Sequence, residues 1–214
     1  MKHEDYMQRC LNLAYLGSSW VAPNPMVGCV IVKDGQIIGE GYHHRFGEAH
    51  AEVNAIASVK DKSLIAGSTL FVNLEPCSHH GKTPPCSDLL VESKIAEIFI
   101  GCRDTNKLVS GRGIEKLQRA GIDVHEGILE TECRLLNKRF FNFHEKKRPY
   151  VILKWAETKD GYIDVLRKNN EKGINWISSE NTKILVHKWR SEEDAILVGR
   201  KTIENDNPQL TVRE

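Results

Sequence analysis

The chain has 214 residues, 40% of them apolar, which is enough for one large domain or for one ordinary domain and part of a second. Its 30 Lys and Arg residues are balanced by 29 Asp and Glu residues, so no excess positive charge is available to bind a long nucleic acid or a membrane surface. We see no signal peptide after Met1 and no apolar run near the roughly 18 residues of a membrane span, so we expect a cytoplasmic protein.

Hydrophobic periodicity and turn residues predict helices and strands that alternate after an initial hairpin. Helices are expected at residues 3–17, 49–58, 86–91, 114–120 and 130–143. Strands are expected at residues 27–32, 36–39, 69–74, 95–100 and near Val124. This alternation is typical of a mixed or parallel sheet with helices on both faces. We therefore predict a three-layer α/β domain over residues 1–145.

The sequence changes character after a charged run that ends in Pro149, and we place a domain boundary between residues 145 and 146. In the second part we expect strands at 150–156 and 195–199, and a helix at 179–190 with Ser178 or Ser179 as its N-cap. About 65 residues are too few to complete a nucleotide-binding α/β domain. Residues 146–214 are therefore predicted to form an incomplete second domain.

Residues 50–86 contain the donor atoms of a predicted metal site. One imidazole, of His50, and two thiols, of Cys77 and Cys86, are ligands of the kind that tetrahedral Zn²⁺ takes. Three protein ligands leave a fourth position for water, and the first turn of the predicted helix places Glu52 near His50 without making it a ligand. A zinc-activated water with its own proton shuttle indicates hydrolytic chemistry.

A structural zinc site is the alternative interpretation, and it needs a fourth protein ligand, which His79 or His80 would supply. Each residue alone is weak evidence, because a His or Glu near a helix start is ordinarily a surface or capping residue. The ordered set of His-x-Glu, a strand, Pro-Cys and a second Cys at a helix start favours the catalytic site. The other four cysteines are expected to be buried thiols: Cys10, Cys29, Cys102 and Cys133.

This order of residues resembles the zinc-dependent nucleobase deaminases, in which a Glu that does not bind the metal moves protons. Many of these enzymes place their two Cys three apart, whereas eight residues separate Cys77 from Cys86. Within that insertion, Lys82 and Thr83 offer a charge and a hydroxyl to a substrate phosphate or a polar base edge, or else belong to a solvated loop.

Residues 23–28, 50–52 and 76–86 look like the deaminase half of the bifunctional riboflavin-biosynthesis deaminase/reductase family, over residues 1 to about 145. The resemblance implies a cytidine-deaminase-like fold, a zinc ion and a homo-oligomer. It also implies a small phosphorylated substrate, 2,5-diamino-6-ribosylamino-4(3H)-pyrimidinone 5′-phosphate, deaminated to the corresponding uracil. The implied zinc ligands are His50, Cys77 and Cys86, with Glu52 as the proton shuttle. The implied substrate contacts are Asn24, His43, Lys82, Thr83, Asp104 and Asn106.

Residues 154–161, 189–191, 194–199 and 202–213 look like the opening of the same family's NADPH-dependent reductase domain, whose fold is similar to dihydrofolate reductase. The resemblance implies NADP contacts by Ala156, Trp176, Thr202 and Asp206, and contacts to the reductase substrate by Arg190, Leu210 and Arg213. Because the family's later glycine-rich cofactor segment is not among the 214 residues, reduction to the ribitylamino product is expected only of the complete protein.

An RNA-associated module related to tRNA editing is the alternative function. The balanced charge and the lack of a basic, aromatic-rich segment count against it.

Overall fold

The computed structural model describes residues 1–78, 84–106, 111–166 and 172–213. The chain divides into two compact units, Met1–Tyr150 and Val151–Glu214. Within the described part of the chain, no helix combines the length and the apolar character that crossing a membrane requires.

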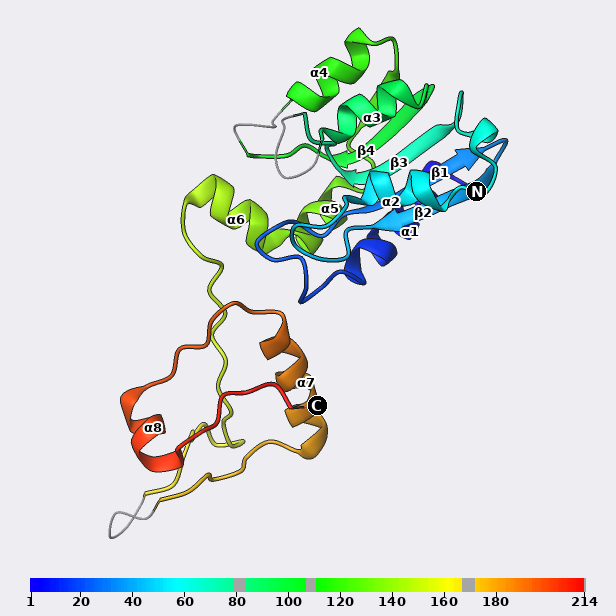
Figure 1. Ribbon diagram of the computed structural model, residues 1–214. Helices are drawn as coiled ribbons and strands as arrows, with labels where there is room; N and C mark the ends of the chain where they lie inside the picture. The colour runs from blue at the N-terminus through cyan, green and yellow to red at the C-terminus, as the bar shows by residue number, and fades with distance from the viewer. Residues whose placement is uncertain (79–83, 107–110, 167–171, 214) are drawn as a thin grey trace. The chain divides into compact units, whose positions relative to one another are not determined.

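The first unit is built on a five-stranded sheet with the strand order β2-β1-β3-β4-β5. β1 (Gly28–Lys33) pairs antiparallel with β2 (Gln36–Tyr42) and with β3 (Thr69–Leu74). β4 (Glu97–Cys102) and β5 (Asp123–Glu126) continue the sheet parallel to β3. The predicted mixed sheet is confirmed, and Figure 1 shows its strands side by side.

The hairpin between β1 and β2 turns at the predicted residues. Asp34 and Gly35 have φ angles of 49° and 75°, the left-handed backbone that a tight hairpin turn requires at both positions. Gly tolerates this backbone without strain, and Asp is one of the few other residues that adopts it readily. The hairpin register therefore follows from the local sequence.

One face of the sheet is covered by α2 (Ala51–Ser58), α3 (Cys86–Glu92) and α4 (Arg112–Arg119). Side chains alternate along a strand, so Leu70 and Val72 of β3 both point into the core beneath these helices. Figure 1 shows α3 and α4 on this side and α1 on the other. A short 3₁₀ turn, η1 (Lys62–Leu64), precedes β3.

The opposite face is covered by α1 (His3–Tyr15), α5 (Glu130–Leu136) and α6 (Lys138–Lys146). Phe71 of β3 and Phe99 of β4 lie on this face, with their rings stacked 4.8 Å apart. The three predicted layers are thus present. The cysteines expected to be buried thiols are free and buried: Cys10, Cys29, Cys102 and Cys133.

The single helix predicted at residues 130–143 is wrong, because α5 and α6 are separate helices that meet at Asn137. Asn137 has φ −101° and ψ 27°, outside the helical range. Its side chain is 3% exposed and hydrogen-bonds the backbone of Met26. An amide that bonds distant backbone competes with a continuous helix.

The second unit contains α7 (Glu180–Ser191) and α8 (Arg200–Asp206). The prediction of α7 is confirmed, with Ser179 as the N-cap that accepts a hydrogen bond from the Thr182 N–H, whereas α8 was not predicted. The strands predicted at 150–156 and 195–199 are wrong, because the described residues of this unit contain no strand. Leu153 and Leu197 are 79% and 99% exposed. Apolar and β-branched residues form a strand only where a partner strand pairs with them.

Candidate metal centre

The three predicted metal ligands lie at the ends of elements on one face of the sheet. The helix predicted from residue 49 begins at Ala51, so His50 is the N-cap of α2 and not part of its first turn, whereas Glu52 lies in the first turn as predicted. Cys77 follows β3 after two residues, and Cys86 is the first residue of α3. Strand and helix ends therefore fix all three side chains.

The donor atoms of these residues converge. Nδ1 of His50 lies 3.3 Å from Sγ of Cys86 and 3.6 Å from Sγ of Cys77. All three donor atoms lie within 4.8 Å of one another. Tetrahedral zinc, with bonds of about 2.3 Å to sulfur and about 2.0 Å to nitrogen, separates neighbouring ligands by roughly 3.5 Å. The donor set and its spacing fit Zn²⁺.

The two thiols of this group differ in their proton affinity. Cys77 accepts hydrogen bonds from the Cys86 thiol, from His50 and, at 3.3 Å, from the Cys86 backbone N–H. These contacts lower the pKa of Cys77 to about 4, which makes it a thiolate at neutral pH. The hydrogen bond to Cys77 and burial both raise the pKa of Cys86, and the bond to Cys77 raises the pKa of His50. Negative charge thus lies where a cation would bind.

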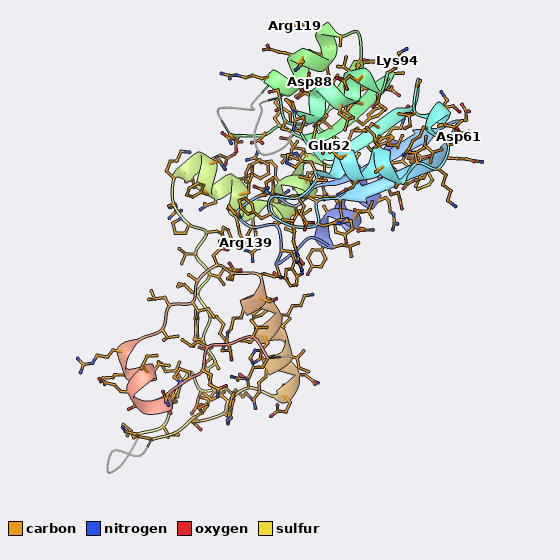
Figure 2. All side chains as sticks on the ribbon, viewed as in Figure 1. Glu52, Asp61, Asp88, Lys94, Arg119 and Arg139 are labelled. Atoms are coloured by element: carbon orange, nitrogen blue, oxygen red, sulfur yellow. The ribbon has the colours of Figure 1, made fainter. Side chains whose placement is uncertain are left out.

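Glu52 lies beside the ligands but is not one of the three grouped donors. Its side chain is 3% exposed, and Figure 2 shows it inside the first unit, whereas Asp61 and Arg119 lie at the periphery. Burial raises the pKa of Glu52, and the Cys77 charge adds to this effect. A carboxyl group with a raised pKa holds a proton more readily than a carboxyl group in water, as a proton shuttle requires.

Asn24 and His43, the predicted base contacts, lie next to each other beside His50. Nδ1 of His43 is 3.0 Å from the carbonyl oxygen of Ala49, which can only accept, so Nδ1 carries the proton. Nε2 of His43 then accepts a hydrogen bond from Nδ2 of Asn24 at 3.1 Å. The His43 and His50 rings meet edge to face at 5.5 Å. Burial lowers the pKa of His43, which favours this neutral state.

Asp104 and Asn106 follow β4 at the same edge of the sheet as Cys77, because β3 and β4 run parallel. The carboxylate of Asp104 accepts a hydrogen bond of 2.7 Å from the Asn106 N–H. Lys82 and Thr83 lie outside the described residues, as do His79 and His80, the candidate fourth ligands of a structural site.

Sequence analysis missed Glu75, which lies two residues before Cys77 and is 4% exposed. Its carboxylate accepts hydrogen bonds of 3.1 to 3.4 Å from the backbone N–H groups of Asp104, Gly111, Gly113 and Ile114. It therefore joins the segment before Cys77 to the start of α4. A Glu placed directly after a buried strand was the available signal.

The candidate reductase residues lie in the second unit. Arg190 of α7 donates to the carbonyl oxygen of Thr211 at 2.7 Å, and the backbone N–H of Arg213 donates to Nδ1 of His187 at 3.2 Å. Arg190 and Arg213, two of the predicted substrate contacts, thus tie the C-terminal segment to α7, and Leu210 lies next to Thr211 in the same segment.

The predicted NADP contacts come from separate segments. Trp176 is 57% exposed and lies under the ammonium group of Lys183, with Nζ 3.6 Å from the ring centre. Thr202 and Asp206 both lie on α8, whereas Ala156 lies before α7, outside any helix or strand.

Comparison with known proteins agrees with both parts of the chain. Residues 1–102 match the cytidine and deoxycytidylate deaminase zinc-binding region, and residues 149–214 match the RibD C-terminal domain. The riboflavin biosynthesis protein RibD of Actinobacillus pleuropneumoniae is 48% identical over 209 residues, which cover 98% of this chain and 54% of that protein. The chain spans about half the length of the curated relatives it matches.

Two solved structures are similar over nearly the whole chain. Acinetobacter baumannii RibD, form 1, has a TM-score of 0.91 and 39% identity, covering 99% of this chain and 58% of that one. The Thermotoga maritima diaminohydroxyphosphoribosylaminopyrimidine deaminase/5-amino-6-(5-phosphoribosylamino)uracil reductase has a TM-score of 0.88 and 47% identity, covering 98% and 59%.

The mixed sheet and the His-Cys-Cys group beside a buried Glu define a zinc-binding protein of the cytidine-deaminase-like class. Both matched regions occur in the same order in one family of riboflavin biosynthesis proteins. The chain belongs to the RibD family, as its motifs suggested.

Proposed function

We propose that this chain carries the deaminase of riboflavin biosynthesis. Its substrate is 2,5-diamino-6-ribosylamino-4(3H)-pyrimidinone 5′-phosphate, and its product is 5-amino-6-ribosylaminouracil 5′-phosphate. The observation that carries the proposal is the convergence of His50, Cys77 and Cys86 beside Glu52, a buried carboxyl group outside the ligand set. The deaminase and reductase names of the Thermotoga maritima relative support the choice of substrate.

The proposal assigns the two parts of the chain to two different reactions. Residues 1–145 form the deaminase domain, and residues 146–214 are an incomplete NADPH-dependent reductase domain, which completes reduction to the ribitylamino product only in the whole protein. By analogy with the family, the protein is a cytoplasmic homo-oligomer.

The proton transfers of the reaction are assigned to Glu52. His50, Cys77 and Cys86 would hold a zinc ion, which would supply the Lewis acidity that makes water a nucleophile near neutral pH. As the oxygen of the attacking water bonds to the ring carbon, the Glu52 carboxylate would accept the proton of the water and return it to the exocyclic amine, so that the carbon–nitrogen bond breaks and ammonia leaves. Burial of Glu52 suits both steps, because it brings the proton affinity of the carboxylate closer to that of the groups with which it exchanges.

Asn24 and His43 are assigned to the pyrimidine base. The bond from His43 Nδ1 to Ala49 makes Nε2 an acceptor, which turns Nδ2 of Asn24 toward His43. Oδ1 of Asn24 is then the atom that accepts an N–H of the base. The polar sugar phosphate is assigned to Lys82, Thr83, Asp104 and Asn106.

Ammonia release from this substrate by the chain loaded with one equivalent of zinc tests the proposal. We expect turnover that a chelator abolishes and added zinc restores. Glu52→Gln is expected to keep one zinc per chain and to lose about 100-fold to 10,000-fold in kcat, the usual contribution of general acid–base catalysis. Glu132→Gln, an exposed position on α5, serves as the matched control with unchanged rate.

Two results would contradict the proposal. A zinc-loaded wild-type chain that releases no ammonia would remove the deaminase function. A Glu52→Gln variant with near-normal kcat would remove Glu52 from the mechanism.

A further inference from the structure

Two buried asparagine side chains hydrogen-bond the backbone of the loop that precedes β1. Oδ1 of Asn137 accepts from the backbone N–H of Met26 at 2.8 Å, and Nδ2 of Asn137 donates to the carbonyl oxygen of Met26, also at 2.8 Å. One side chain therefore binds both backbone groups of a single residue that lies 111 positions away in the sequence.

Asn73 of β3 binds the same loop from the sheet. It is 0% exposed, donates from Nδ2 to the Met26 carbonyl oxygen at 3.1 Å, and accepts from the Gly28 N–H at Oδ1 at 2.8 Å. Four hydrogen bonds from two buried amides thus fix the backbone of residues 26–28. Buried amides are costly unless they are satisfied in this way.

The loop that contains Met26 also contains two residues that hydrogen-bond His43. Asn24, two residues before Met26, donates to His43 Nε2 at 3.1 Å. The backbone N–H of His43 donates to the carbonyl oxygen of Val27 at 2.9 Å. A shift of the Met26 backbone would therefore move Asn24 relative to His43, whose ring touches the His50 ring.

We propose that Asn137 is a positioning residue for the pyrimidine base, acting through the Met26 backbone on the Asn24–His43 pair. The inference rests on the proposed function, because the base is the ligand that the pair would hold. It also accounts for the break between α5 and α6, since an apolar residue at position 137 would allow a continuous helix but would leave the Met26 N–H without its hydrogen-bond acceptor. Among the described residues, the side-chain hydrogen bonds of Asn137 go to Met26 and not to His50, Cys77 or Cys86, so its loss should affect substrate binding more than metal binding.

The experiment compares Asn137→Ser with Asn142→Ser. Asn142 lies on α6 and donates to the Arg148 carbonyl oxygen at 2.9 Å, away from the site, so the control loses the same kind of side-chain-to-backbone bond. For Asn137→Ser we expect KM to rise at least about 10-fold, the effect of leaving buried hydrogen-bonding groups unpaired. We expect kcat to change by less than about 3-fold and zinc to stay at one per chain, whereas Asn142→Ser should keep the wild-type KM.

Hydrogen exchange provides a readout that does not depend on turnover. Peptides containing the amides of Met26 and Gly28 should exchange faster in Asn137→Ser than in the wild type or in Asn142→Ser. Asn73→Ser removes the other donor to the Met26 carbonyl oxygen and should produce the same rise in KM, which keeps the inference testable if Asn137→Ser does not fold.

A KM within about 2-fold of the wild type overturns the inference, and so does a loss of kcat in proportion to lost zinc, because either result leaves Asn137 with a structural role only. Failure of the proposed function looks different, since the wild-type chain itself would then release no ammonia.

Discussion

Cys77 and Cys86 have distinct protonation chemistry although both serve as candidate ligands. Cys77 accepts hydrogen bonds and has a pKa lowered to about 4, whereas Cys86 donates one and has a raised pKa. A metal ligand must be deprotonated, so metal binding at this pair releases a proton from Cys86. Zinc affinity should therefore depend on both sulfur atoms.

Replacing Cys86 by Ser should weaken zinc binding by at least about 100-fold, because even the outer partners of metal ligands contribute about 10-fold to 100-fold. The measurement is competition for zinc with a chromogenic chelator. Cys10→Ser is the matched control, because Cys10 is a buried thiol that donates to the Phe71 carbonyl oxygen at 3.3 Å, a bond that a hydroxyl can replace. Wild-type zinc affinity in Cys86→Ser would show that Cys86 is not a ligand.

Residue types and spacing were sufficient to predict that His50, Cys77 and Cys86 lie together, because metal chemistry restricts the side chains that can serve. The catalytic role of Glu52 stays a prediction. The same reasoning could not find Glu75 or Asn137. Their partners are backbone N–H and C=O groups, so no residue type in the sequence identifies those partners.

At the scale of elements, α4 approaches the segment that leads to Cys77 at Gly113. A Cβ atom there would lie 2.1 Å from the carbonyl oxygen of Pro76 and 3.2 Å from Oε1 of Glu75. Only a residue without a side chain allows this contact. The start of α4 and the Cys77 segment therefore keep their spacing through Gly113 and the Glu75 carboxylate.

Gly113→Ala should lower the free energy of unfolding by about 1–3 kcal/mol, the usual cost of overpacking. A loss of stability would be informative, because replacing Gly by Ala in an exposed helix interior instead stabilises the protein by about 1 kcal/mol. Urea unfolding with zinc in excess measures the difference. Gln118→Ala, exposed on α4, should stay within about 0.5 kcal/mol of the wild type. A Gly113→Ala variant as stable as the wild type would mean that α4 can move away from Pro76 without cost.

Most elements of the first unit could be predicted because each has a local cause. β3 begins and ends at the predicted residues, and α3 begins at Cys86 as predicted. The errors share a long-range cause. The break at Asn137 depends on Met26, and the absence of strands from the described part of the second unit reflects a lack of pairing partners that no local pattern reports.

At the scale of the whole molecule, the two units differ in how well they bury their predicted site residues. The deaminase candidates His43 and Glu52 are buried, whereas Trp176 and Thr202, assigned to NADP, are exposed. Cofactor sites bury most of the surface of their ligand. The described residues of the second unit offer no such enclosure at these two positions.

We therefore expect the 214-residue chain to show no saturable NADPH binding at micromolar cofactor concentration, as measured by calorimetry. The Thermotoga maritima relative, whose name includes a reductase, is the positive control. Saturable micromolar binding by the present chain would contradict the expectation and would place a competent cofactor site within residues 146–214.

The two ends of the connection between Cys77 and Cys86 are hydrogen-bonded to each other. The N–H of Ser87 donates to the Cys77 carbonyl oxygen at 3.1 Å, and the N–H of Cys86 donates to Cys77 Sγ. A segment closed at its base in this way can be exchanged for one of another length without disturbing β3 or α3. Connections of different length or composition between these two cysteines are accordingly expected to leave the His50, Cys77 and Cys86 donor group in place.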